Sequence, residues 1–414
     1  MNILILGSGG REHALAWAAQ QHPGVDLVVA APGNAGTARV AEAASLDILD
    51  AEAVAELAVA EAIDLCLVGP EAALAAGVAD RLREAGIAVL GPSAEAARIE
   101  TSKSFAKSVC DAAGIATAPW ARFDDLGAAE ARIRAAGAPV VIKADGLAAG
   151  KGVVVAEGVE EAVEAARALL AQGPIVVEGW LGGREASFFA LCDGEEAIPF
   201  GTAEDHKRAF DGDRGPNTGG MGAFSPSPLL AGREGRVMDE VIRPALREMA
   251  RRGTPYRGVL YAGLMIEGEA IRVVEFNARL GDPEAQVLLM RLGAQAVDLM
   301  QACAEGRLAG ERAHWAEDHA LCVVVASEGY PGPHATGVPI EGLDALPEDS
   351  RRMVFHSGTR EADGRIVSAG GRVLSVTARA GTLAEAREAA YALTDRIRFP
   401  GGFCRRDIGA KALG

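Results

Sequence analysis

Residues 2–10 read Asn-Ile-Leu-Ile-Leu-Gly-Ser-Gly-Gly, an apolar run followed at once by a glycine-rich turn. The apolar run predicts a buried strand, and the residues from position 11 onward predict a helix that begins directly after the turn. A strand, a glycine turn and a helix in this order form the first unit of an α/β fold.

The same alternation of short strands and helices continues to about residue 100. Strands are expected at 2–6, 26–30, 64–68 and 87–90, and helices at 11–21, 51–61, 72–85 and 94–112. This pattern is typical of a doubly wound parallel sheet. Each predicted strand ends in a glycine-bearing loop, and ligands of open α/β sheets bind at these carboxyl ends. The first hundred residues are therefore expected to carry a ligand site at that edge.

Gly9 and Gly10 open the first predicted helix, whose free amides and dipole suit an anion. The dinucleotide fingerprint G-x-G-x-x-G requires a third glycine where this chain has Glu12. A phosphorylated small molecule therefore fits the loop better than a dinucleotide does. A purely structural turn is the alternative interpretation.

Composition narrows the class of protein further. The chain has 414 residues, which predicts two to four domains at roughly 100–200 residues each. Its net charge of −16 argues against a nucleic-acid-binding protein, although a few local cations suffice to hold a small phosphate. The six cysteines are scattered, so neither a disulfide framework nor a metal–thiolate site is expected. Without a signal peptide or a long apolar stretch, no membrane span is expected, and the cytoplasm is the expected location.

A second unit is expected from about residue 118 to 190. The predicted strand 139–143 ends in Lys143, and a glycine-rich loop connects it to a strand at 153–155. The loop lacks the P-loop spacing, so residues 146–152 are expected to form a flap over a polyphosphate, with Lys143 and Lys151 near its oxygens. Lys107 is expected to be a solvated surface charge. The strand at 175–181 runs into a connector that suits a planar adenine.

The stretch 275–284 reads Glu-Phe-Asn-Ala-Arg-Leu-Gly-Asp-Pro-Glu and follows another predicted strand. Glu275 and Asn277 point to the same face of that strand, and their oxygens suit Mg²⁺ bridging phosphates. A solvated strand end is the alternative. The polar, glycine-rich segment 205–222 favours a substrate loop. After about residue 315, three strand-like runs and one helix predict a small α+β domain.

Taken together, these stretches resemble the glycinamide ribonucleotide synthetases, also called phosphoribosylamine–glycine ligases, of the ATP-grasp superfamily. The matching motifs are 7–14, 31–37, 68–71, 142–153, 205–208, 215–223, 261–265, 275–277, 281–284 and 403–409. The resemblance implies an α/β and α+β multidomain fold. An N-terminal doubly wound parallel sheet would span 1–101, an ATP-grasp domain 102–315 with a lid at about 120–188, and a C-terminal α+β domain 316–414.

The resemblance also implies an activity. The chain would join glycine to 5-phosphoribosylamine at the expense of ATP, by way of glycyl phosphate, with Mg²⁺ or Mn²⁺. The products would be glycinamide ribonucleotide, ADP and phosphate, in de novo purine biosynthesis. The protein would work as a monomer, with small molecules as its partners and with neither nucleic acid nor a membrane.

Residue roles follow from the same resemblance. The residues implied for ATP are Lys103, Lys143, Lys151, Glu178, Trp180, Leu181 and Glu185, and those for the metal are Glu275 and Asn277. The catalytic residues implied are Lys207, Arg279 and Asp282. The substrate residues implied are Gly9, Gly10, Glu12, Asp205, Arg208, Asn217, Gly220, Arg279 and Glu284. The chain departs from the family at Trp180, where Phe is expected, and at Ala278, where Cys is expected. The stretch 261–265 offers no carboxylate as a further metal ligand.

Three alternatives remain at this point. Another ATP-grasp carboxylate–amine ligase or carboxylase would share the fold and the ATP site, but not the loops at 32–37 and 216–223. A nicotinamide-dependent dehydrogenase is disfavoured by Glu12. A nucleotide-binding regulator without chemistry would not need Glu275, Asn277 and Arg279 together.

Overall fold

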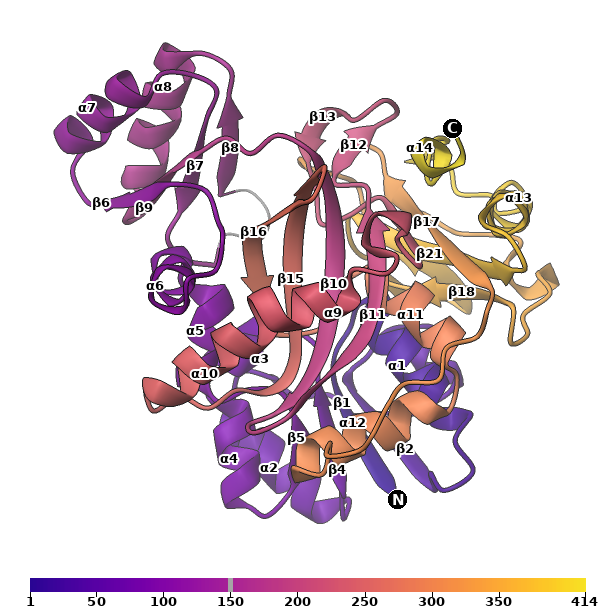
Figure 1. Cartoon of the computed structure of the whole chain (residues 1–414). Helices are drawn as coiled ribbons and strands as arrows, with labels where there is room; N and C mark the ends of the chain where they lie inside the picture. Colours follow the sequence, from indigo (N-terminus) through magenta and orange to yellow (C-terminus); the bar gives the residue numbers. More distant parts are fainter. Residues whose placement is uncertain (148–151) are drawn as a thin grey trace.

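An open parallel sheet of five strands, in the order β3-β2-β1-β4-β5, is built from the N-terminal residues (Figure 1). The computed structural model describes residues 1–147 and 152–414. The elements of this part are β1 (Asn2–Gly7), α1 (Gly10–Gln20), β2 (Leu27–Pro32), β3 (Glu42–Ala43), α2 (Ala51–Ala60), β4 (Leu65–Val68), α3 (Glu71–Ala75), α4 (Val78–Glu84) and β5 (Ala88–Leu90). The predicted doubly wound sheet is confirmed.

Two helices predicted as continuous are each divided in two. The prediction of one helix at 72–85 is wrong, because the chain leaves α3 at Ala76 and Gly77 adopts a φ of 81° before α4 begins. The prediction of one helix at 94–112 is also wrong. Ser102 is extended between α5 (Ala94–Thr101) and α6 (Lys103–Ala113), and its hydroxyl accepts a hydrogen bond from the Phe105 amide at 3.2 Å. Ser102 thus ends one helix and caps the next.

A four-stranded antiparallel sheet lies in the region predicted as the lid, in the order β6-β9-β7-β8. Its elements are β6 (Trp120–Phe123), α7 (Leu126–Ala136), β7 (Val140–Ala144), β8 (Val153–Ala156), α8 (Val159–Leu170) and β9 (Ile175–Gly179). Helices α7 and α8 pack together on this sheet and stand apart from the rest of the chain at the top left of Figure 1. The centre of the predicted flap, residues 148–151, lies outside the described residues.

A nine-stranded sheet runs through the remainder of the chain in the order β16-β15-β10-β11-β14-β17-β21-β18, with β22 beside β17. Its strands are β10 (Arg184–Asp193), β11 (Ala197–Asp205), β14 (Gly222–Ser225), β15 (Arg257–Glu267), β16 (Ala270–Asn277), β17 (His319–Ser327), β18 (Arg352–His356), β21 (Arg372–Ala380) and β22 (Gly402–Phe403). The C-terminal strands therefore continue the central sheet, because β14 pairs with β11 on one side and with β17 on the other.

Helices and two short hairpins complete this part. The hairpins are β12 (Arg208–Phe210) with β13 (Arg214–Asn217) and β19 (Thr359–Ala362) with β20 (Arg365–Ser368). The helices are α9 (Glu234–Val237), α10 (Arg243–Arg251), α11 (Glu284–Leu292), α12 (Gln295–Glu305), α13 (Leu383–Thr394) and α14 (Ala410–Leu413), with a π-helical turn at Met238–Ile242 and 3-10 turns at Thr37–Arg39, Pro228–Leu230 and Leu343–Ala345.

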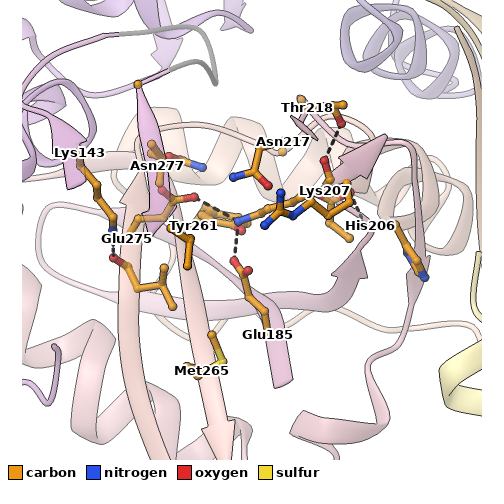
Figure 2. A pocket seen from close by; sticks show the side chains of 18 of the residues that line it. Lys143, Glu185, His206, Lys207, Asn217, Thr218, Tyr261, Met265, Glu275 and Asn277 are labelled. Carbon is orange, nitrogen blue, oxygen red and sulfur yellow. Dashed lines mark hydrogen bonds and ion pairs between the residues drawn. The ribbon is translucent and has the colours of Figure 1, made fainter. Parts of the chain in front are cut away.

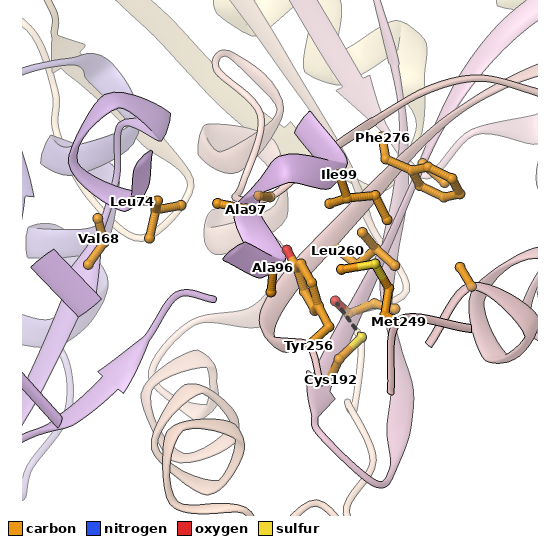
Figure 3. Close-up of a cluster of buried hydrophobic side chains, with 14 of the residues drawn as sticks. Val68, Leu74, Ala96, Ala97, Ile99, Cys192, Met249, Tyr256, Leu260 and Phe276 are labelled. Carbon is orange, nitrogen blue, oxygen red and sulfur yellow. Dashed lines mark hydrogen bonds between the residues drawn. The ribbon is translucent and has the colours of Figure 1, made fainter. Parts of the chain in front are cut away.

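The largest core joins the N-terminal sheet to the central one. In Figure 3, Ala97 and Ile99 of α5 lie between Leu74 on the side of the N-terminal sheet and Leu260 and Phe276 on the side of the central sheet. Burying side chains of this size contributes roughly 1.5–3 kcal/mol each relative to exposure. This shared core fixes the end of β16 relative to the loops of the N-terminal sheet.

In the part of the chain that the structure describes, no single helix combines the length and the apolarity needed to cross a membrane. Helices α11 and α12 meet the criterion only when taken as a pair, and they are bent by 107° at the break between them. Both are buried along most of their length.

Candidate active site

A cavity of about 910 Å³ lies where the lid, the central sheet, the N-terminal loops and the C-terminal strands meet. Most of the residues predicted for a site line it. These are Lys103, Lys143, Glu178, Trp180, Leu181, Glu185, Asp205, Lys207, Arg208, Asn217, Glu275, Asn277, Arg279, Asp282 and Glu284. Residues from positions 103 to 284 are thus brought to one place, as Figure 2 shows for ten of the lining residues.

Four predicted residues, Gly9, Gly10, Glu12 and Gly220, lie beside the cavity rather than on its wall. Glu12 contacts it through Arg11, a lining residue whose guanidinium is 2.5 Å from the Glu12 carboxylate. The remaining predicted residue, Lys151, lies outside the described residues.

The Glu12 side chain explains why the first loop is rich in glycine. The Gly9 amide, at the N-terminus of α1, donates a hydrogen bond to Glu12 Oε2 at 2.6 Å. This amide is therefore occupied by a carboxylate of the chain itself. A Cβ at Gly7 would lie 2.7 Å from the Glu12 side chain, and one at Gly9 would lie 2.8 Å from it. The glycines therefore make room for a buried glutamate, which occupies the position where a dinucleotide fingerprint has glycine.

The end of β16 presents Glu275 and Asn277 to the cavity, while Phe276 between them points into the core. The pairing of β16 with β15 shifts by one residue at Val274, which is the geometry of a β-bulge. The carbonyl of Val274 accepts a hydrogen bond from Lys143 Nζ at 3.3 Å. The bulge thus directs one backbone oxygen toward the lid lysine and the two side-chain oxygens into the cavity.

Lys207 lies between two carboxylates, as the dashed lines in Figure 2 show. Its Nζ is 2.5 Å from Glu185 Oε1 and 3.4 Å from Glu275 Oε1. Burial alone would lower the pKa of Lys207, but the neighbouring carboxylates raise it well above its usual value. Burial would raise the pKa of Glu275, but Lys207, Lys143 and Lys103 lower it to about 2. Lys207 and Glu275 are therefore both charged at neutral pH.

Glu178 is held between two buried lysines. Lys107 Nζ lies 2.9 Å from Glu178 Oε2, and Lys143 Nζ lies 3.1 Å from Glu178 Oε1. The prediction that Lys107 is a surface charge is therefore wrong: its side chain is 4% exposed, and its Nζ also donates to Thr117 Oγ1 at 2.7 Å. The helical sequence around Lys107 could not reveal this, because its partner comes from β9 of the lid.

Arg279 is fixed by two carboxylates from the N-terminal part of the chain. Its Nε lies 2.9 Å from Glu71 Oε2, and its Nη2 lies 2.9 Å from Glu100 Oε1. Burial opposes the charge of Arg279, yet the two glutamates raise its pKa. The first residue of α3 and helix α5 thereby fix the orientation of a guanidinium predicted to be catalytic.

Asp282 is held by an arginine from the C-terminal strands that the sequence did not reveal. Arg372 Nη2 is 3.1 Å from Asp282 Oδ2, and Arg372 Nη1 donates to the carbonyls of Asp282 and Gly219. Sequence reasoning missed Arg372 because it stands alone at the start of a strand with no motif around it. It also missed Glu100, which lies inside a helical pattern.

Two further carboxyls face the cavity near Lys207. Asp205 ends β11, and Glu284 begins α11 and accepts a hydrogen bond from Ser187 Oγ at 3.2 Å. Burial raises the pKa of both carboxyls, and the charge of Glu284 raises that of Asp205 further, well above its usual value. A cationic group placed between them would reverse this shift. The cavity wall thus carries Lys143 on the side of β7 and the two carboxyls of Asp205 and Glu284 on the side of the central sheet.

Comparisons with known proteins identify the family. Models described as the N domain, the ATP-grasp (A) domain and the C domain of phosphoribosylglycinamide synthetase match residues 1–100, 101–285 and 320–411, respectively. A phosphoribosylamine–glycine ligase from Mesorhizobium japonicum is 50% identical over 100% of this chain and 99% of that protein. The resemblance noted in the sequence is confirmed over its full length.

Solved structures agree. The phosphoribosylamine–glycine ligase of Thermotoga maritima is 35% identical, with a TM-score of 0.84 over 99% of this chain and 100% of that chain. A biotin carboxylase from Campylobacter jejuni shares the fold, with a TM-score of 0.74 at 18% identity over 97% of this chain. On this evidence, the chain belongs to the phosphoribosylglycinamide synthetase family.

Proposed function

We propose that the chain ligates glycine to 5-phosphoribosylamine with ATP, giving glycinamide ribonucleotide, ADP and phosphate in purine biosynthesis. The observation that carries the proposal is the single cavity in which Lys143, Lys207 and Arg279 stand around the Glu275–Asn277 edge. The support from comparison is the set of relatives with this name that match the chain along its whole length.

Two bond exchanges make up the reaction. A carboxylate oxygen of glycine attacks the γ-phosphorus of ATP, so the bond to ADP breaks and glycyl phosphate forms. The amine nitrogen of phosphoribosylamine then attacks the acyl carbon, phosphate leaves with its bonding electrons, and the nitrogen loses one proton. Both steps depend mainly on positioning and on neutralising charge, which lysine and arginine side chains supply.

The residues divide between the reactants by charge. Lys103 and Lys143 suit the phosphates of ATP, the Glu178–Leu181 stretch its adenine, and Glu185 its ribose. Asp205 and Glu284 suit the ammonium group of glycine, because a cation relieves the repulsion between two buried carboxyls. Lys207, Arg208, Asn217 and Arg279, with the loops at Gly9, Gly10 and Gly220, are proposed to hold the reacting phosphoryl group and the sugar phosphate. The carboxylates of Glu12 and Asp282 are proposed to orient Arg11 and Arg372 beside them.

Glu275 and Asn277 fit a Mg²⁺ or Mn²⁺ ion, because an ionised carboxylate and an amide oxygen point from the same face of one strand into the cavity. Among the described residues, no cluster of three or more His, Cys, Asp and Glu side chains could hold a metal by itself. The phosphate oxygens of the nucleotide and water would therefore complete the ligand set. When bound, the ion supplies neutralisation of phosphate charge.

An omission assay tests the proposal. With Mg²⁺, ADP release should require both glycine and phosphoribosylamine, and it should equal the amide formed. ADP release that depends on another acid or amine would instead support a different ATP-grasp ligase, and no ADP release with all reactants would overturn the proposal. We further propose that the enzyme works in the cytoplasm as a monomer, which sedimentation of the purified protein tests in part.

A further inference from the structure

The motif at 403–409 has no part in the chemistry proposed above. All seven of its residues are described by the structure, and the cavity wall does not include them. The motif lies instead against the hairpin formed by β12 and β13, on the side of the cavity where Figure 1 shows β12, β13 and α14 close together.

Arg405 is the centre of these contacts. Its side chain is 1% exposed, and its Nε and Nη2 form a two-point pair with Asp407, each at 2.7 Å. Nη2 also lies 2.8 Å from Asp213 Oδ1, and Nη1 donates to the Arg208 carbonyl at 3.0 Å. One buried guanidinium therefore holds the hairpin at two points, at Arg208 of β12 and at Asp213 in the turn.

Other residues of the motif also contact the hairpin, at its turn and just before its first strand. The Gly212 amide donates to Asp407 Oδ2 at 2.8 Å, and the Arg406 amide donates to Asp211 Oδ1 at 2.7 Å. The rings of Phe210 and Phe403 lie 5.9 Å apart. Just before the hairpin, the Gly409 amide donates to Nε2 of His206 at 3.2 Å.

The hairpin needs such an anchor because it buries little of its own surface. Phe210, the turn residues 211–213 and the first residues of β13 are exposed, and the two strands pair only with each other. An isolated two-stranded hairpin is marginal in water, and ordering each residue costs roughly 1–2 kcal/mol. The residues that it carries into the cavity are nevertheless among those proposed for the reaction: Arg208 and Asn217, with Lys207 directly before it.

We propose that residues 403–409 form a C-terminal clamp that holds the β12–β13 hairpin over the cavity, and that Arg405 is the positioning residue of this clamp. Arg405 acts through the backbone of Arg208 and the carboxylate of Asp213, not through contact with a substrate. The inference rests on the proposed function, because it assigns the clamp to the step in which glycyl phosphate awaits the amine.

Loosening the clamp should uncouple the reaction. A displaced hairpin admits water to the cavity, and water then attacks glycyl phosphate to return glycine and phosphate. ATP is thereby converted to ADP and phosphate with no amide formed. Exclusion of water by closing segments is the usual protection for such intermediates.

Arg405→Met tests the clamp, and Arg406→Met is its matched control. Arg406 is the next residue, but its exposed side chain pairs with Asp395 at the end of α13 and not with the hairpin. We expect Arg405→Met to release more ADP than amide and to raise the KM for phosphoribosylamine about tenfold, because the hairpin carries Arg208 and Asn217, which are proposed to hold the sugar phosphate. Arg406→Met should keep the wild-type ratio of one ADP per amide and the wild-type KM. General loss of folded enzyme would lower kcat without altering that ratio or the KM.

Asp211→Ala is the second test if Arg405→Met does not fold. Asp211 is exposed at the hairpin turn, and its side chain accepts a hydrogen bond from the Arg406 amide. We expect the same uncoupling in this variant, to a smaller degree. The clamp would be overturned if a folded Arg405→Met showed coupled turnover and an unchanged KM. If Arg405→Met does not fold, the same result in Asp211→Ala would overturn it. Equal uncoupling in Arg406→Met would do so as well. A wild-type chain that forms no amide would refute the proposed function instead.

Discussion

Glu275 keeps a negative charge inside a cavity that three lysines also approach. Burial would raise the pKa of Glu275, and Lys207, Lys143 and Lys103 together bring it down to about 2. The carboxylate is therefore ready to meet a cation at neutral pH, and it also orients Lys207. Both properties are lost when the side chain is shortened.

We expect Glu275→Ala to lower Mg²⁺-dependent ADP formation by about 100-fold or more, the usual effect of removing one charge-stabilising group. Initial rates at several Mg²⁺ concentrations would measure it. Glu267→Ala is the control, because Glu267 is an exposed carboxylate on the neighbouring strand β15, paired with Arg272. Unchanged Mg²⁺ dependence in Glu275→Ala would remove this residue from the proposed metal ligands.

Lys107 is a second residue whose charge matters for the site. Of the two lysines paired with Glu178, it is the nearer one. Among the described residues, Glu178 Oε1 is paired with Lys143 at 3.1 Å but accepts no hydrogen bond, so it can accept one from the 6-amino group of adenine in the role proposed for it. With Lys143 on the phosphates of ATP, as proposed, Lys107 alone would orient the carboxylate. Hydrogen bonds to charged groups contribute about 1.5–3 kcal/mol, or roughly a factor of ten or more in affinity.

Lys107→Met should therefore reduce the preference for ATP over ITP, which lacks the amino group, by about tenfold in kcat/KM. Steady-state rates with the two nucleotides provide the measurement. Lys107→Arg keeps the charge and should keep most of the preference. The same preference in a folded Lys107→Met would show that Glu178 needs no help from Lys107.

At the scale of elements, His206 joins the end of β11 to the C-terminal segment. It is 8% exposed, and its Nε2 accepts the Gly409 amide, so the other nitrogen carries the proton. Burial first, and then the charge of Arg405, lower the pKa of His206 to about 4. In the unfolded chain the imidazole of His206 takes up a proton near pH 6.5, but in the folded chain it does so only near pH 4. His206 therefore makes the folded state less stable as the pH falls between these two values.

Between pH 7.5 and 5, this single histidine should cost the folded state about 2 kcal/mol. We expect Tm to fall over that interval, and to fall less in His206→Gln, which has no proton to take up. Thermal unfolding at the two pH values checks this, with His314→Gln at an exposed position as the control. An equal drop in Tm for His206→Gln and the wild-type chain would assign the effect to other groups.

The limits of sequence-based prediction also lie between elements. The prediction of a helix at 94–112 holds within each half, because both α5 and α6 are helical. The break at Ser102 could not be predicted, because its hydroxyl donates a hydrogen bond to Asp145, just after β7, and a local pattern cannot show such a partner. Glu275 and Asn277 share a face as predicted, since alternation along a strand is a local property. The surroundings of Lys107 and the contacts of Arg372 depend on residues far away in the sequence, so no local pattern contained them. The individual residue roles stay predictions.

At the scale of the whole molecule, the continuous central sheet brings a C-terminal residue to the reaction. Arg372 begins β21 and connects Asp282 with the loop at Gly219. We expect Arg372→Met to lower kcat/KM by about 100-fold, as misplacement of binding groups does. Arg365→Met, at an exposed position on β20, should leave it unchanged. Normal kcat/KM in a folded Arg372→Met would show that Asp282 is held well enough without it.

The sheet also sets a condition on biosynthesis. Strand β14 pairs with β17, which lies more than 90 residues later in the chain. A ribosome adding about 5–20 residues per second needs several seconds to make that stretch. During this interval β14 is an unprotected edge, which invites pairing with other nascent chains. Chains released before β17 is made should therefore aggregate, and helper proteins that shield newly made strands should matter most in those seconds.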